Sequence, residues 1–238
     1  MNESKVKNHY TKFDQAYRDS YGPILQTCRT SKPLEMLRYI GEKLQLKKGE
    51  TLLDCGGGYG LPAAFFADNF DVEVVSLNIT ECQLEVARKN YPQVEHVGIS
   101  FDNLDTLNRK FDKIMFLESF GHTQNISTLF SSVCERLNPG GVVFIKHPAA
   151  SRRSQTITQI EEFYQYKFFS TIDMHLGAVA ADLSLLECSV SPYGEYDPFL
   201  VNRFSNYVEG EKCFLHPNDP DFRFMKYYDF VFIKESYE

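Results

Sequence analysis

A glycine-rich loop directly follows a short apolar run that ends in an acid. In the segment TLLDCGGGYG, Asp54 precedes four glycines that occupy five positions. Glycine has no side chain, so it lets the backbone of a loop approach a ligand closely. In an open parallel sheet, the loop between the first strand and the next helix lies at the edge where ligands bind. The segment therefore predicts a cofactor-binding loop.

Two kinds of cofactor are compatible with such a loop. A dinucleotide fingerprint requires G-x-G-x-x-G/A and an acid about 20 residues later for the ribose. Gly58, Gly60 and Ala63 satisfy the first condition formally. The second condition fails, because the next apolar strand ends in Asn78. The sequence therefore disfavours a nicotinamide-dependent oxidoreductase.

A second candidate for chemistry stands at the end of a later apolar run, FDKIMFLES. Glu118 is near the end of this run, and His122 follows it in the segment ESFGH. A carboxylate at the carboxyl end of a strand points toward the edge of the sheet where ligands bind. We therefore take Glu118 and His122 as candidate catalytic residues. The alternative is that Glu118 caps the next helix or contacts a substrate amine.

The elements that must position these residues alternate between strand and helix. Strands are expected at 51–55, 72–78, 94–100, 111–119 and 142–147, with helices at 61–70, 80–91 and 125–137 between them. Continuous apolar strands separated by helices predict a parallel sheet covered on both faces. A helical segment at about 156–182 and two further strands follow. We expect an N-terminal helical cap at 1–46 and a catalytic domain at 47–238, with a substrate-covering insertion at about 191–225.

Composition excludes several classes of partner. The chain has 25 Lys and Arg against 32 Asp and Glu, a net charge of −7, so no nucleic acid or anionic membrane surface is expected. Six cysteines stand apart without a C-x-x-C pair, which is typical of reduced thiols in a cytoplasmic protein. No run approaches the roughly 18 apolar residues of a membrane span. The scattered histidines predict no metal site held by the protein alone, and a homo-oligomer remains open.

Three segments together resemble the class I S-adenosylmethionine-dependent methyltransferases. LLDCGGGYG is similar to their first motif, an acid followed by G-x-G-x-G, and FDKIMFLES and LNPGGVVFIK resemble their fourth strand and the turn before their fifth. The resemblance implies a Rossmann-like α/β fold with a mostly parallel seven-stranded sheet, an antiparallel last strand and an N-terminal helical lid. It implies that S-adenosylmethionine contacts Asp54, Gly56, Gly58, Gly60, Asn78, Ile79, Gln83, Ser100, Phe101 and Asp102.

The segment SLNITECQ narrows the resemblance to enzymes that methylate alkene carbons. Sterol methyltransferases, cyclopropane synthases and prenyl-diphosphate C-methyltransferases replace the usual ribose-binding acid with Asn or Thr and carry a Gln five residues later. Asn78 and Gln83 match that pattern here. Glu118 would then accept the proton that the methylated acceptor must lose. The alternative is that Asn78 is a neutral variant of a ribose contact.

A prenyl diphosphate acceptor would need aromatic walls and cations. Candidate substrate-binding residues are therefore aromatic side chains in the expected lid and insertion and basic ones after the fifth strand: Tyr17, Tyr21, Tyr193, Tyr196, Lys146, His147, Arg152 and Arg153. Any Mg²⁺ would arrive with the diphosphate. The preferred hypothesis is a prenyl-diphosphate C-methyltransferase acting on isopentenyl, geranyl or farnesyl diphosphate. A small-molecule N- or O-methyltransferase and a non-catalytic cofactor-binding module remain the alternatives.

Overall fold

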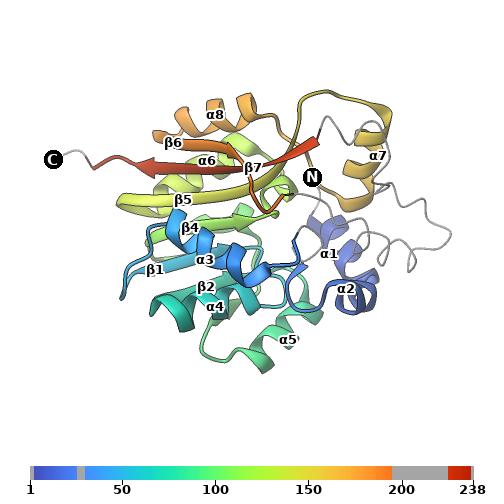
Figure 1. Cartoon of the computed structure of the whole chain (residues 1–238), viewed down its shortest axis with the longest axis horizontal. Coiled ribbons are helices and arrows are strands. Elements are labelled where there is room, and N and C mark those ends of the chain that lie inside the picture. Colours follow the sequence, from blue (N-terminus) through green and yellow to red (C-terminus); the bar gives the residue numbers. More distant parts are fainter. Residues whose placement is uncertain (1–2, 26–29, 195–224, 237–238) are drawn as a thin grey trace.

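The computed structural model describes residues 3–25, 30–194 and 225–236. At its centre is a seven-stranded sheet in the order β3-β2-β1-β4-β5-β7-β6 (Figure 1). The strands are β1 (Thr51–Cys55), β2 (Glu73–Leu77), β3 (Glu95–Val97), β4 (Phe111–Leu117), β5 (Leu137–Ala150), β6 (Leu183–Val190) and β7 (Met225–Lys234). Strands β1 to β5 pair in parallel, and β7 is antiparallel to both β5 and β6. The expected α/β fold with an antiparallel last strand is confirmed.

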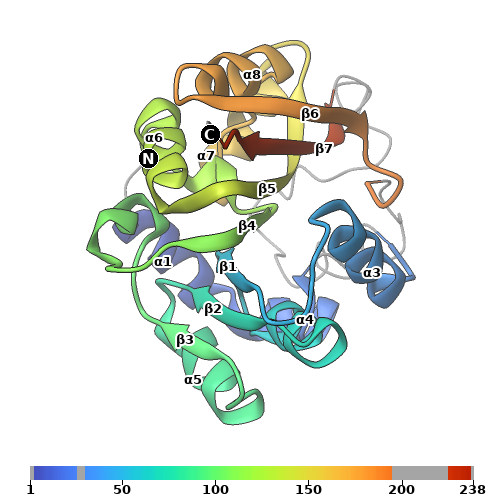
Figure 2. The same cartoon turned by 90° about the vertical axis from the view of Figure 1, so that its left-hand side faces the viewer.

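Helices cover both faces of the sheet (Figure 2). On one face, α3 (Pro33–Lys43) and α4 (Leu61–Phe70) bury apolar side chains against the strands. On the other face, α6 (Ile126–Arg136) and α8 (Thr171–Val179) do the same. Helix α5 (Glu81–Asn90) contacts β3. Because both faces are close-packed, side chains at the ends of the strands are held in fixed positions.

Three further helices gather beyond the carboxyl ends of the parallel strands (Figure 1). They are α1 (Glu3–Lys12), α2 (Asp14–Tyr21) and α7 (Gln155–Tyr164). Helix α3 was expected to belong to the same cap, yet it packs on the sheet with α4. The boundary between cap and domain at residue 46 stays a prediction.

The helical segment expected at 156–182 is interrupted. Helix α7 ends at Gln165, which has a left-handed backbone with φ 52°. Helix α8 begins after Ser170, whose side chain forms a capping box with Asp173. Reciprocal hydrogen bonds of this kind start a new helix, so the expectation of one continuous segment was wrong. The interruption brings an aromatic segment, discussed below, to the candidate site.

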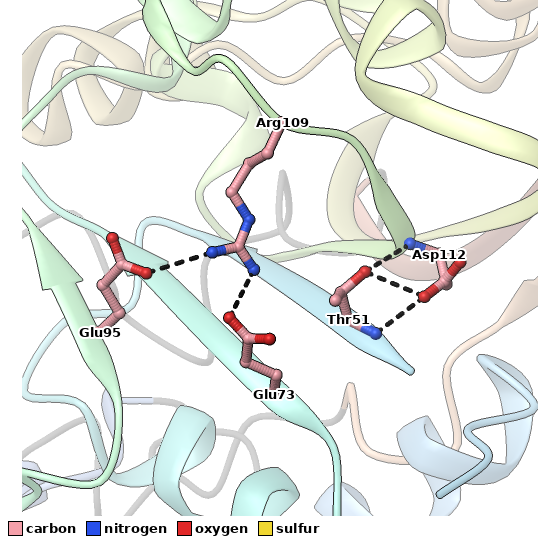
Figure 3. Close-up of polar contacts among 5 residues, drawn as sticks. All are labelled: Thr51, Glu73, Glu95, Arg109 and Asp112. Carbon is pink, nitrogen blue, oxygen red and sulfur yellow. Dashed lines mark hydrogen bonds and ion pairs between the residues drawn. The ribbon is translucent and has the colours of Figure 1, made fainter. Parts of the chain in front are cut away.

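Polar contacts tie together the opposite edge of the sheet (Figure 3). The Arg109 guanidinium contacts Glu73 at 2.8 Å and Glu95 at 3.3 Å, at the starts of β2 and β3. The Asp112 carboxylate accepts hydrogen bonds from the main-chain nitrogen and the hydroxyl of Thr51, each at 2.9 Å. Exposed ion pairs contribute about 0–1 kcal/mol each. This edge lies at the amino ends of the parallel strands, away from the candidate site.

Two expectations about the chain as a whole can be compared with the described residues. Within them, Cys55, Cys82, Cys134 and Cys188 are free thiols. None of the described helices combines the length and the apolar character that a membrane crossing requires.

Candidate active site

Consecutive glycines form the base of the site directly after β1. The N–H groups of Gly56 and Gly57 both donate to the Leu77 oxygen, each at 2.9 Å. A Cβ on Gly56, where φ is 92°, would lie 2.5 Å from Ser119 Cβ, and one on Gly57 would lie 1.8 Å from Ser76 Oγ. Close packing therefore requires glycine at both positions. The sequence motif did not mark Gly57, because its importance comes from the neighbouring strand.

The remaining glycines of the motif have different surroundings. Gly58, with φ 53°, lines the cavity described below. Gly60, with φ 87°, precedes α4, and a Cβ there would lie 2.9 Å from both Ala87 Cβ and His96 Cε1. Gly60 is not among the described residues that line the cavity. Its position lets α4 approach α5 and β3, which is a packing role.

Asp54 lies beneath the loop and is 1% exposed. Its Oδ2 accepts a hydrogen bond from Ser76 Oγ at 3.3 Å. Burial raises the pKa of Asp54 to about 7, and the hydrogen bond from Ser76 opposes this shift only in part. Asp54 lines a small recess together with Gly56–Tyr59 and Pro62. A cationic group bound in this recess would favour the ionised carboxylate.

Asn78 and Gln83 contact each other beside the glycine loop, and together with Gly56 and Gly58 they line a groove for the expected cofactor. Asn78 Nδ2 donates to the Gly58 oxygen and to Gln83 Oε1, each at 2.9 Å, and Asn78 Oδ1 accepts from the N–H of Thr80. Both amide hydrogens of Asn78 are therefore in use. Gln83 is 3% exposed, and its Nε2 has no hydrogen-bond partner among the described residues. A buried donor without a partner fits a ligand hydroxyl, so the groove suits a ribose-containing cofactor.

The far wall of the groove contains four more of the residues expected to contact S-adenosylmethionine. Ile79, Ser100, Phe101 and Asp102 all line the same cavity as Gly56 and Gly58. The Asp102 carboxylate accepts hydrogen bonds from Thr123 Oγ1 at 2.5 Å and from the N–H of Gln124 at 3.0 Å. Asp102 therefore anchors the segment that leads into α6 while it forms part of the wall.

The cofactor groove continues into an aromatic space under the cap. The cavity is partly open to solvent, and its lining runs from the glycine loop and Asn78 to the helices of the cap. Its aromatic lining residues are Tyr10, Tyr17, Tyr21, Phe101, Tyr164, Tyr166, Phe168 and Tyr227. Tyr17 and Tyr21, which the sequence predicted, are among them.

Glu118 also lines this cavity. Its backbone is left-handed, with φ 58°, and its N–H donates to the Lys146 oxygen at 2.9 Å. Its side chain is 13% exposed, and Oε1 lies 3.4 Å from Lys146 Nζ. A residue other than glycine in this conformation carries strain of about 1–3 kcal/mol, and such strain concentrates at functional sites.

His122 also lines the cavity, but both of its ring nitrogens are engaged. Nδ1 donates to the Gln165 oxygen at 2.8 Å, so in the neutral ring Nε2 accepts from the Tyr10 hydroxyl at 3.0 Å. Burial lowers the pKa of His122 to about 4, so the ring is neutral near pH 7. In this arrangement His122 connects the cap helix α1 to the sheet.

The basic residues predicted to bind substrate fall into two groups. Lys146 and His147 are buried behind the cavity wall, and His147 Nδ1 lies 2.8 Å from the hydroxyl of Tyr166. Arg152 and Arg153 are exposed, and Arg153 contacts Glu161 of α7 at 2.6 Å. None of the four is among the described residues that line the cavity.

The aromatic residues predicted in the late insertion are only partly described. The Tyr193 ring packs 5.5 Å from the Tyr39 ring, and its main-chain oxygen accepts a hydrogen bond from Lys146. Tyr193 is not among the described lining residues. Tyr196 and most of the 191–225 insertion lie outside the described residues.

Sequence reasoning missed the aromatic segment at the end of α7 and directly after it. Tyr164, Tyr166 and Phe168 all line the cavity. The signal was present, because five of the seven residues in FYQYKFF are aromatic. Only the left-handed turn at Gln165 shows that the chain leaves the helix there and turns toward the site.

Among the described residues, no group of His, Cys, Asp and Glu is placed to hold a metal ion.

A family comparison agrees with this geometry. Residues 6–174 match the family described as mycolic acid cyclopropane synthetase, which is more than half of the chain. The chain belongs to this family. The resemblance to class I S-adenosylmethionine-dependent methyltransferases is thereby confirmed, and the family assignment supports S-adenosylmethionine as the cofactor.

Individual curated relatives align with part of this chain. A cyclopropane-fatty-acyl-phospholipid synthase from Escherichia coli is 31% identical over 159 residues, which cover 62% of this chain and 41% of that protein. A sphingolipid C9-methyltransferase from Komagataella phaffii is 26% identical over 181 residues, which cover 65% of this chain and 37% of that protein. The chain thus spans less than half the length of these curated relatives.

Solved structures with the same fold cover nearly the whole chain. A cyclopropane synthase from Mycobacterium tuberculosis superposes with a TM-score of 0.79 at 15% identity, covering 98% of this chain and 99% of that one. A geranyl diphosphate C-methyltransferase from Streptomyces coelicolor superposes with a TM-score of 0.70 at 17% identity, covering 84% and 80%. At these identities the likeness shows the fold alone.

Proposed function

We propose that this protein transfers the methyl group of S-adenosylmethionine to a carbon atom of an alkene in an apolar acceptor, with Glu118 as the base. The observation that carries the proposal is the position of Glu118. Its side chain lines the same cavity as Gly56 and Gln83 of the groove and as the aromatic residues of the cap. Family membership supports the same class of reaction.

The residues of the site divide the work of such a reaction. When bound, S-adenosylmethionine supplies an electrophilic methyl group on a sulfonium. The alkene π electrons would form the new bond to the methyl carbon while the bond from that carbon to sulfur breaks. S-adenosylhomocysteine would leave as a neutral thioether, and the positive charge would be carried by the neighbouring carbon of the acceptor. Aromatic faces such as those of Tyr21 and Tyr166 stabilise that charge. Glu118 then accepts a proton from an adjacent carbon, which restores a double bond.

The cap contributes by excluding water from the reacting atoms. Tyr10 lies on α1 and donates to His122, which is itself bonded to the backbone after α7. A carbocation is captured by water unless the site is closed, so a held cap favours deprotonation over hydration. His122 is neutral near pH 7 and serves as a support for the cap.

A prenyl diphosphate is the narrower proposal for the acceptor. Its hydrocarbon chain suits the aromatic space. Its diphosphate requires cations, and no Lys or Arg is among the described lining residues. The diphosphate would therefore lie toward the exposed Arg152 and Arg153, with any Mg²⁺ entering as part of the substrate. Geranyl diphosphate and geraniol, which share one chain, would show whether the diphosphate contributes to recognition.

The test of Glu118 is methyl transfer from labelled S-adenosylmethionine with Glu118→Gln. Removal of a general base costs about 10²–10⁴-fold in kcat, and we expect a loss in that range with acceptor binding retained. Glu50→Gln is the matched control, because Glu50 is a glutamate paired with Lys113 at the opposite edge of the sheet. Undiminished turnover of Glu118→Gln would show that Glu118 is not the base.

A second candidate, N-methylation of an amine, is favoured by the charge of the lining. The described lining contains the acids Glu3, Asp102 and Glu118 and no Lys or Arg, and its one histidine, His122, is neutral near pH 7. Carboxylates and tyrosine faces suit an ammonium group. In that case Glu118 would orient an amine. Labelling of small amines but not of alkenes, without competition from inorganic diphosphate, would select this candidate.

A further inference from the structure

Lys146 is a buried lysine that contacts the proposed base twice. It lies on β5 and is 1% exposed. Its main-chain oxygen accepts a hydrogen bond from the N–H of Glu118 at 2.9 Å, and its Nζ lies 3.4 Å from Glu118 Oε1. Lys146 therefore holds both the backbone and the carboxylate of Glu118.

The other neighbours of Lys146 enclose its charge within the protein. Nζ donates to the Tyr193 oxygen at 2.9 Å and lies 4.7 Å from the centre of the Tyr227 ring. Across the β5–β7 pair, Lys146 faces Asp229, which is fully buried and accepts a hydrogen bond from Tyr39 at 3.2 Å. A buried ammonium is tolerated when it has partners of this kind. Lys146 is therefore supplied with partners before any substrate binds.

We propose that Lys146 is a positioning residue that holds the Glu118 carboxylate in the cavity that the cofactor groove and the acceptor space share. Glu118 has a strained, left-handed backbone, which persists only where its surroundings impose it. The ion pair with Lys146 supplies that constraint at the side chain, and the β4–β5 pairing supplies it at the backbone. This role rests on the proposed function of Glu118 as the base.

The proposal differs from the role that the sequence suggested for Lys146. A lysine that binds a diphosphate would affect KM for diphosphate acceptors and leave other acceptors unchanged. A lysine that positions Glu118 would lower kcat for every acceptor and leave KM and cofactor affinity nearly unchanged. Comparing the change in kcat with the change in KM therefore distinguishes a positioning role of Lys146 from a diphosphate-binding role.

The experiment compares Lys146→Met with Lys113→Met. Lys113 is the matched control, because it is a buried lysine on the neighbouring strand β4, 3.6 Å from Glu50 at the opposite edge. We expect Lys146→Met to lose about 10²-fold in kcat, as a misplacement of about 1 Å at a reacting group does. Lys113→Met should lower the melting temperature without a change in kcat. A full kcat in Lys146→Met would overturn the proposal.

A double variant and a structure complete the test. If Lys146 acts through Glu118, Glu118→Gln/Lys146→Met should turn over no more slowly than Glu118→Gln alone. A further loss in the double variant would indicate a separate role for Lys146. The crystal structure of Lys146→Met should show the Glu118 carboxylate displaced, and an unmoved carboxylate would refute positioning even if no acceptor were turned over. Failure of the wild-type protein on every acceptor would instead refute the proposed function.

Discussion

Buried Asp54 predicts that cofactor affinity depends on pH near neutrality. Burial raises the pKa of Asp54 to about 7, whereas burial lowers the pKa of His9 and His147 to about 3 and that of His122 to about 4. Asp54 is thus the described group near the site whose charge changes between pH 6 and pH 8. A ligand ammonium in the recess beside Asp54 would bind the ionised form more tightly.

The size of the effect follows from the ionised fraction. With a pKa of about 7, roughly a tenth of Asp54 is ionised at pH 6 and roughly nine tenths at pH 8. If the ionised form binds, the titration of Asp54 alone should lower the dissociation constant about tenfold over this range, or about 1.4 kcal/mol. Binding at pH 7 should release a fraction of a proton, because the ligand draws the remaining protein into the ionised form.

Calorimetry with S-adenosylhomocysteine at pH 6, 7 and 8 measures this dependence. Asp54→Asn removes the titrating group, so its curve should lack the tenfold change. Asp112→Asn is the matched control, because Asp112 holds Thr51 at the opposite end of β1 (Figure 3). The ligand amino group has an ordinary pKa of about 7.7–8.0 and titrates with every variant, so the difference between curves belongs to Asp54. Methylthioadenosine, which lacks the amino acid, should bind without the pH effect.

The reasoning is refuted if wild-type affinity is flat from pH 6 to pH 8, or if Asp54→Asn retains the change.

The free energy of unfolding provides an independent test of the raised pKa of Asp54. Between about pH 4 and about pH 7 the folded chain keeps a proton on Asp54 that the unfolded chain has released. The free energy of unfolding should therefore decrease with rising pH across this window, and Asp54→Asn should flatten that slope.

Two further predictions concern the loop and the cap. Gly57→Ala would place a Cβ 1.8 Å from Ser76 Oγ, and it should destabilise the fold by about 1–3 kcal/mol and weaken cofactor binding. Gly98→Ala is the milder control, because the atom nearest to its Cβ would be 3.3 Å away. Equal melting temperatures of the two variants would contradict the packing argument. Tyr10→Phe removes the hydrogen bond to His122, worth about 0.5–1.5 kcal/mol, and should raise the acceptor KM up to about tenfold without a change in cofactor affinity. Unchanged acceptor kinetics would mean that this bond does not hold the cap.

Much of the cofactor groove could be predicted because its signals are local. The acid, the glycines and the following helix are contiguous in sequence, and Asn78 and Gln83 are five residues apart. Gly60 shows the limit of such signals, since it matches the motif yet packs against α5 and β3. Gly57 shows the converse, because Ser76 of the adjacent strand imposes it.

The acceptor side depended on contacts between distant segments. Tyr10 and His122 are 112 residues apart, and Tyr166 reaches the cavity only because α7 ends at Gln165. Lys146 follows an apolar run, so its charge suggested a substrate ligand. The structure buries it between Glu118 and the Tyr193 backbone. Sequence periodicity reports which face of an element is apolar but not which side chain of another element meets it.

The sequence by itself determined the class of fold, the cofactor loop and the acid at the end of β4. These follow from hydrophobic period, glycine placement and the rule that ligands gather at the carboxyl ends of parallel strands. Only the tertiary structure decided which groups surround Glu118, which tyrosines line the same cavity, and that no Lys or Arg is among its described lining residues. Those questions depend on side chains that burial brings together from β4, β5, β7 and the cap, and burial is a property of the whole packed chain.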